Sequence, residues 1–164
     1  MTTETPLRDP VSTASVAELK TYVGRELGVS EWRPISQEDV DAFAAATGDR
    51  QWIHTDPVRA AAGPFGGTIA HGYYTLSLAP VLLEQVLRLD EFAFSVNYGL
   101  NKLRFPAPLK VGESVRLRAT LVELEEFTSG ATLTVQLTFE RSGGDKPACV
   151  ATALYRVLER GPQS

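Results

Sequence analysis

A central apolar stretch spans residues 72–87 and reads GYYTLSLAPVLLEQVL. Its apolar side chains leave little polar surface on the first turns of a helix. A helix that is apolar nearly all round is normally buried inside a domain. Pro80 removes one backbone donor, so we expect it to kink the helix or to restart it. The sequence therefore predicts a mostly buried central helix over residues 72–87.

The part of the chain after this helix predicts strands. Several segments alternate apolar and polar residues, which is the two-residue period of a half-buried strand. Short turns such as Ser142-Gly143-Gly144 indicate antiparallel hairpins. The expected strands cover residues 92–98, 102–105, 114–125, 132–140 and 148–158.

The part before the central helix predicts shorter helices and one brief strand. Ser36 with Asp39 resembles a capping box, and Gly48 can end that helix in a left-handed conformation. Asp56-Pro57 is typical of the start of another small helix, which reaches Ala62. The remaining predicted elements are a helix over Val16–Leu27 stopped by Gly28, and a strand over Glu31–Ile35.

This order of elements predicts an α+β fold. An antiparallel sheet wrapped around one buried helix is the economical arrangement, although the pattern alone leaves other α+β sheets open. Residues 1–14 are polar and contain two prolines, so we expect a flexible lead-in. Residues 15–160 are expected to form one domain.

Composition excludes several classes of protein. The chain has 164 residues, 43% hydrophobic and 22% charged, with a net charge of −4 and dispersed cations, which argues against nucleic-acid binding. Cys149, the single cysteine, lies in an apolar run and predicts a buried inert thiol. Residues 1–10 do not resemble a signal peptide, and residues 76–89 are too polar and short to cross a bilayer. We expect a cytoplasmic protein without a membrane partner.

Asp49 and His54 are the candidate catalytic residues. Both histidines of the chain fall within residues 48–72, and His54 follows Asp49 by five residues, on a loop expected after Gly48. A carboxylate and an imidazole that converge on one water can move protons near neutral pH. From the spacing alone, structural roles for both residues remain the alternative. A zinc site would need three or four ligands, so we expect no metal.

Three segments, taken together and in this order, resemble the MaoC-like dehydratase family. They read ATGDRQWIHTDP (46–57), GGTIAHGY (66–73) and NYGLNKLRF (97–105), and the last is followed by Pro106, Pro108 and residues 111–113, VGE. The resemblance covers about residues 16–158. It implies a single hot-dog domain, in which an antiparallel sheet wraps around the central helix.

The resemblance also implies an activity. Members hydrate the double bond of a trans-2-enoyl thioester with an Asp-His pair, in positions that Asp49 and His54 occupy here. This chain would accordingly be an (R)-specific enoyl-CoA hydratase that forms (R)-3-hydroxyacyl-CoA reversibly, without a cofactor. Many members have Asn-Pro before the Ile-His, whereas this chain has Arg50-Gln51-Trp52. The departure leaves the acyl chain length open, since Trp52 could shape the acyl pocket.

Other residues receive candidate roles beside this pair. Gly72, at the start of the central helix, is expected to offer a backbone donor to the thioester oxygen. His71 could orient that loop or contact substrate, and Ser77 could reach the pocket. Local hydrogen bonds are the alternative for both.

Coenzyme A carries phosphates, which need cations. Lys102, Arg104 and Arg59 are candidates, with ordinary solvated side chains as the alternative. The resemblance implies a homodimer with active sites near its interface. Two other functions stay open at this point: a hot-dog acyl-CoA thioesterase, and a non-catalytic acyl-thioester-binding subunit of a larger dehydratase.

Overall fold

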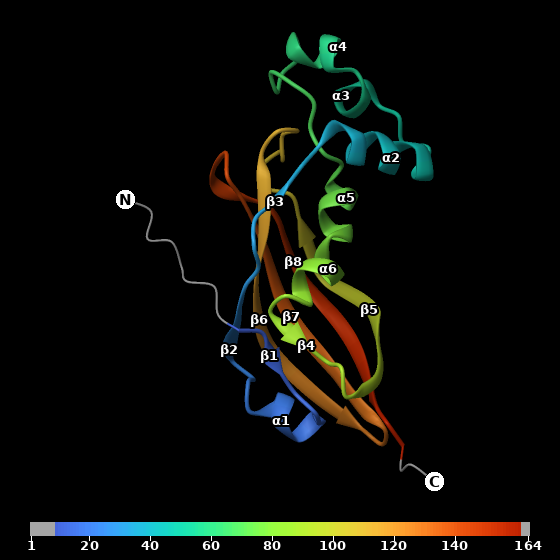
Figure 1. Ribbon diagram of the computed structural model, residues 1–164, viewed down its shortest axis with the longest axis vertical. Helices are drawn as coiled ribbons and strands as arrows, with labels where there is room; N and C mark the ends of the chain where they lie inside the picture. Colours follow the sequence, from blue (N-terminus) through green and yellow to red (C-terminus); the bar gives the residue numbers. More distant parts are fainter. Residues whose placement is uncertain (1–8, 162–164) are drawn as a thin grey trace.

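A long antiparallel sheet dominates the computed structural model, which describes residues 9–161 (Figure 1). Its strands lie in the order β2, β6, β7, β8 and β5, and β3 also pairs with β6. Neighbouring strands are antiparallel, as the short turns predicted, and β5 forms an edge of the sheet. The strands are β2 (Arg25–Val29), β3 (Arg33–Pro34), β5 (Phe92–Arg104), β6 (Ser114–Phe127), β7 (Gly130–Arg141) and β8 (Gly144–Glu159).

The two-residue alternation predicted for the later strands is confirmed. The inward-facing residues of β6 and β7 are at most 1% exposed, namely Val115, Leu117, Ala119, Leu121, Leu133, Val135, Leu137 and Phe139. Residues 92–98 and 102–105 were expected as two strands but form the single strand β5. Its ladder with β8 continues through Gly99, and bulges absorb the irregular register.

The central helix is divided into α5 (Gly72–Ser77) and α6 (Ala79–Leu83). Pro80 lies in the first turn of α6, so the predicted restart at this proline is confirmed. The helix ends earlier than predicted, because Leu87 belongs to a short strand. Among the described residues, no helix is both long and apolar enough to cross a membrane.

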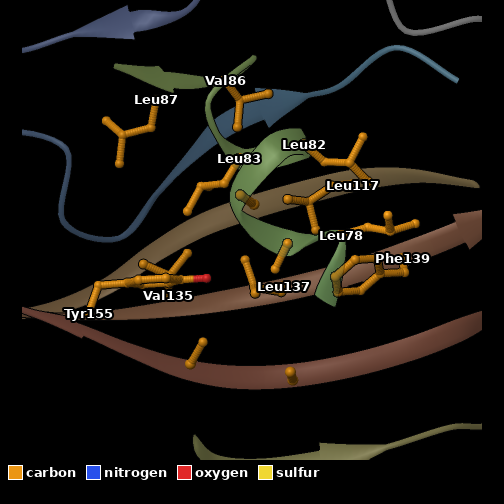
Figure 2. Close-up of a cluster of buried hydrophobic side chains, with 14 of the residues drawn as sticks. Leu78, Leu82, Leu83, Val86, Leu87, Leu117, Val135, Leu137, Phe139 and Tyr155 are labelled. Atoms are coloured by element: carbon orange, nitrogen blue, oxygen red, sulfur yellow. The ribbon is translucent and has the colours of Figure 1, made fainter. Parts of the chain in front are cut away.

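The core lies between this helix and the inner face of the sheet. Figure 2 shows Leu82 of α6 next to Leu117 of β6, and Leu78 close to Leu137 and Phe139 of β7, all in one buried cluster. Leu82 is 1% exposed and the two β7 residues are fully buried. The long antiparallel sheet packed on this helix confirms the predicted α+β, hot-dog architecture. The helix is buried on one face only, since Tyr73 and Val81 are 70% and 45% exposed, so the prediction of a mostly buried helix is wrong for its outer face.

The N-terminal segment differs from its prediction in two places. Residues 1–8 of the expected flexible lead-in lie outside the described residues, but β1 (Val11–Ser12) pairs in parallel with β4 (Leu87–Arg88), and Thr13 is 2% exposed. The prediction of a flexible segment up to residue 14 is therefore wrong at its end.

The helix expected over Val16–Leu27 is also too long. Only α1 (Val16–Lys20) is helical, and β2 begins at Arg25. Leu27 is buried from a strand that pairs with β6. Gly28, expected to stop a helix, instead follows a register shift in β2, and its missing side chain leaves room for Val86.

Three helices lie together beyond one end of the sheet (Figure 1). They are α2 (Gln37–Thr47), α3 (Trp52–Thr55) and α4 (Pro57–Ala61). The predicted caps are confirmed, since Ser36 and Asp56 accept hydrogen bonds from the amides of Asp39 and Arg59. These helices and the start of α5 position the candidate site.

Candidate active site

Asp49 begins the loop that follows α2. Gly48 ends that helix with a φ of 82°, in the left-handed region that glycine adopts readily, so the chain turns away immediately before Asp49. The Asp49 side chain is 58% exposed. One of its oxygens, Oδ1, accepts the amide N–H of Gln51 at 3.4 Å. The turn therefore presents a solvated carboxylate near the N-terminal end of α5.

His54 lies in the one-turn helix α3 and not in the open loop that the sequence predicted. The residue is only 7% exposed. Its Nδ1 lies 2.6 Å from the carbonyl oxygen of Ile69. A carbonyl can only accept a hydrogen bond, so Nδ1 carries the proton and the neutral ring has its lone pair on Nε2.

The surroundings of His54 favour this neutral ring. Burial lowers the pKa of His54 below its ordinary value of 6.5, and the nearby His71 adds to that effect. The hydrogen bond to Ile69 and the charge of Asp49 act in the opposite direction without reversing it. At neutral pH, His54 is a buried imidazole with a lone pair available to accept a proton.

His71, the residue immediately before α5, contacts both Asp49 and His54. It is 3% exposed and stacks on the ring of His54, with centroids 3.7 Å apart and planes 25° apart. Its Nε2 lies 2.9 Å from the backbone oxygen of Asp49 and 3.9 Å from that residue's Oδ2. Among the described residues, its buried Nδ1 has no hydrogen-bond partner.

The three side chains converge closely. A carboxylate oxygen of Asp49 and one ring nitrogen each of His54 and His71 lie within 4.8 Å of one another. This span suits a water held between Asp49 and His54 by two hydrogen bonds. A shared metal ion fits poorly, because a nitrogen ligand points its lone pair at the ion in the plane of its ring, and the two rings stack face to face.

Gln37, in the first turn of α2, is a supporting residue that the sequence did not reveal. Its Nε2 donates to the backbone oxygen of His54 at 2.7 Å, and its Oε1 accepts from the hydroxyl of Thr68 at 2.6 Å. The amide of Ile69 also donates to the oxygen of Ile53. These bonds tie α2 and α3 to the segment that precedes α5, so the His54 backbone and ring are both held.

Gly72 opens α5, where the first amides of a helix have no intrahelical acceptor. The ring of Phe105 covers its Cα: a Cβ at this position would lie 2.9 Å from two ring carbons. Only glycine therefore fits here without a shift of Phe105. The position agrees with the expected backbone donor, whose role stays a prediction.

Comparison with known proteins supplies the family. Residues 18–141 match the MaoC like domain, which is most of the chain. The chain belongs to the MaoC-like domain family.

Two relatives and one solved structure illustrate the similarity. The chain is 52% identical over 145 residues to 3-hydroxyacyl-thioester dehydratase Z of Mycobacterium tuberculosis, covering 88% of this chain and 96% of the relative. It is 42% identical over 141 residues to nodulation protein N of Rhizobium leguminosarum bv. viciae, covering 84% and 87%. The (R)-hydratase from A. caviae involved in PHA biosynthesis superposes with a TM-score of 0.64 at 31% identity, covering 81% of this chain and 94% of that structure.

An apolar groove of about 440 Å³ flanks α5 in this MaoC-like domain. Neither Asp49 nor His54 lines it. Its walls are residues of the helical segment from Tyr73 to Pro80 and residues of β5, β7 and β8. Ser77 lines the groove as well, but its hydroxyl donates back to the Tyr74 carbonyl at 2.7 Å. The local hydrogen bond considered for Ser77 is therefore present.

Trp52, in α3, packs against α4 and the loop that follows it. The guanidinium of Arg59 stacks on its ring at 4.4 Å, and Gly63 lies so close that a Cβ there would contact the ring at 3.0 Å. These contacts give Trp52 and Arg59 a role in joining α3 to α4 in the MaoC-like domain. A contact of either residue with substrate stays a prediction.

Lys102 and Arg104 lie near the end of β5, and both are exposed. The Nη1 of Arg104 donates to the neighbouring carbonyl of Leu103. Phe105 follows directly and packs on Gly72, so the backbone of Arg104 lies close to the start of α5. Their position suits a phosphate-bearing ligand, and the role stays a prediction for this MaoC-like domain.

Proposed function

We propose that this protein hydrates trans-2-enoyl-CoA to (R)-3-hydroxyacyl-CoA, reversibly. The observation that carries the proposal is the convergence of the Asp49 carboxylate and the His54 ring within 4.8 Å, with His54 Nδ1 already committed to Ile69. Its Nε2, which makes no hydrogen bond within residues 9–161, and the carboxylate offer two acceptors to one water. The relatives named as a dehydratase and as an (R)-hydratase support the same class of reaction.

The first step is attack of this water on the substrate. The double bond is conjugated to the thioester, so its Cβ is electrophilic. One water proton passes to Nε2 of His54 while the oxygen forms a bond to Cβ. Asp49 orients the water and stabilises the imidazolium that results. The electron pair of the double bond moves toward the thioester, whose oxygen gains negative charge.

The second step returns the proton. The Gly72 amide stabilises the enolate oxygen, in the manner of an oxyanion hole. The imidazolium of His54 then protonates Cα, which completes the addition of water and restores the neutral ring. No metal or organic cofactor takes part, because the conjugated thioester already supplies the electron sink.

We also propose that two copies of the chain pair through β5. This edge strand carries large apolar side chains at alternate positions, each 44–56% exposed: Phe94, Val96, Tyr98 and Leu100. Tyr73 of α5 is 70% exposed beside them, and both elements line the apolar groove. An unpaired edge and a contiguous apolar surface favour association with a partner. The homodimer would cover this surface and close the groove around the acyl chain.

Incubation of the purified protein with crotonyl-CoA tests the reaction. The enoyl absorbance and free thiol are followed together in the same sample. Hydration lowers the absorbance without release of thiol. Release of thiol would identify a thioesterase, and no change in either would point to an acyl-thioester-binding subunit; both results contradict the proposal.

The stereochemistry needs a second measurement. An (S)-specific 3-hydroxyacyl-CoA dehydrogenase supplied with NAD⁺ should leave the product unoxidised, whereas an (R)-specific one should reduce NAD⁺. Reduction by the (S)-specific enzyme would contradict the proposed configuration.

A further inference from the structure

We propose that His71 is a positioning residue that fixes the distance between Asp49 and His54. This inference rests on the proposed hydration. The sequence alone allows two roles for His71, a contact with substrate or a local structural hydrogen bond. The structure brings one ring into contact with both members of the pair, through a hydrogen bond to one and a ring stack on the other.

The contact with Asp49 is polar and directional. Nε2 of His71 donates to the backbone oxygen of Asp49 at 2.9 Å, since a carbonyl can only accept. Asp49 lies in a loop just beyond the left-handed Gly48, and its carboxylate is largely solvated. The His71 donor is thus a restraint that ties this exposed turn to the buried start of α5.

The contact with His54 is a stack of two rings 3.7 Å apart. One edge of His54 is held by Ile69, so the stack leaves its ring no freedom to tilt toward α5. The ring of Phe43, in α2, also packs on His71, with ring centroids 5.0 Å apart. The ring of His71 is therefore a spacer between the α2 side of the core and the catalytic imidazole.

The buried nitrogen without a partner indicates that the His71 ring does more than fill space. Its buried Nδ1 has no hydrogen-bond partner within the described chain, which carries a desolvation cost that an apolar ring would avoid. The other nitrogen, Nε2, makes the hydrogen bond that ties the ring to the backbone oxygen of Asp49. Positioning of the catalytic turn offsets the cost.

Two substitutions separate the donor from the ring. His71→Phe keeps a ring against His54 but removes the donor, whereas His71→Gln keeps an N–H at a similar reach and removes the ring. We expect kcat for crotonyl-CoA hydration to fall about tenfold or more in His71→Phe, with KM little changed, because misplacement of catalytic groups is costly. His71→Gln should recover most of this loss.

The pH profile supplies a readout that packing alone would not move. The titratable groups that bear on His54 are His71, from the start of α5, and Asp49, from the loop after α2. Because His71 helps to lower the pKa of His54, a neutral amide in its place should move the acid limb of kcat/KM to higher pH. Phe43→Leu, which alters packing on His71 without a polar contact, is the matched control and should leave the limb in place.

Nuclear magnetic resonance of the untagged wild-type protein tests the geometry without activity or mutation. The chain has two histidines, so only four imidazole nitrogen signals have to be assigned. At pH 8 we expect His54 protonated on Nδ1 and His71 on Nε2.

The opposite tautomer of His71 would overturn the inference, as would equal kcat losses in His71→Phe and His71→Gln or no loss in either. A wild-type protein that does not hydrate crotonyl-CoA would instead refute the proposed function, and the tautomers would still decide the inference.

Discussion

The Nδ1 of His54 donates a 2.6 Å hydrogen bond to the carbonyl oxygen of Ile69, across fifteen residues of chain. This bond fixes both the orientation and the tautomer of the ring. It directs the lone pair to Nε2, the nitrogen that a catalytic base uses in the proposed reaction. The chemistry of the site therefore depends on a backbone oxygen in the segment before α5.

Substitution of the pair should remove hydration and leave the fold intact. Asp49→Asn is nearly isosteric but is not ionised, and His54→Ala removes the imidazole. We expect each to lower kcat/KM for crotonyl-CoA about a hundred- to ten-thousandfold. Because both residues hold the same water, the double mutant should be little worse than either single one.

Thermal unfolding checks these variants independently of activity. The Asp49 carboxylate is largely exposed, so Asp49→Asn should unfold close to the wild-type temperature. A folded Asp49→Asn protein with near-wild-type hydration would remove Asp49 from the mechanism. Asp56 is the nearest alternative carboxylate in the sequence, although its side chain caps α4.

Stability should fall as the pH is lowered through about 6.5. The pKa of His54 is lower in the folded protein than its ordinary value of 6.5, so the unfolded state takes up a proton first. The unfolded chain then binds more protons than the folded one, and the free energy of unfolding decreases with falling pH. Urea unfolding at a series of pH values between 5 and 8 measures the slope.

His54→Gln is the control for this titration. A neutral amide does not ionise, so the slope below pH 6.5 should be shallower than in the wild-type protein. Equal slopes in both proteins would mean that the lowered pKa of His54 does not contribute, and that other groups account for the pH dependence.

Gly72→Ala should impair the proposed oxyanion site through Phe105. The new Cβ would meet two ring carbons at 2.9 Å, so the ring or the start of α5 has to shift. Loss of an oxyanion donor costs about a hundred- to a thousandfold in kcat, and we expect a partial displacement to cost up to about a hundredfold.

Phe105→Leu tests this explanation by compensation. A smaller side chain relieves the contact, so Phe105→Leu combined with Gly72→Ala should recover much of the lost kcat. Phe105→Leu alone is the reference for the effect of the ring. Without recovery in the double variant, the contact with Phe105 is not the cause of the loss.

Local signals in the sequence predicted local structure well. The Ser36 cap and the left-handed Gly48 bound α2 where expected, because both act within one turn of the helix. The segment from Val16 to Leu27 was misassigned, since the apolar spacing there fits a helix as well as a strand. Pairing with β6 decides the matter, through contacts such as the Gly24 amide with the Leu121 oxygen.

The site follows the same division. The convergence of Asp49 and His54 could be predicted from their chemistry and from the resemblance, whereas their catalytic role stays a prediction. The role of Gln37 could not be predicted, because it forms hydrogen bonds with His54 and Thr68, which lie 17 and 31 residues away in the sequence. No local sequence pattern indicates such long-range bonds. The stack of His71 on His54 likewise depends on how α5 meets α3 in the folded chain.

Disruption of the β5 surface should dissociate the proposed homodimer. Val96 is 44% exposed at the centre of the strand's apolar residues. In Val96→Lys, pairing of two β5 edges would bring two lysines into an apolar interface, which is unfavourable without partner charges. We expect sedimentation velocity to give a dimer for the wild-type protein and a monomer for this variant. Val122→Lys, at an exposed valine of β6 away from β5, is the matched control and should stay dimeric. A monomeric wild-type protein, or a Val96→Lys variant as dimeric as Val122→Lys, would contradict pairing through β5.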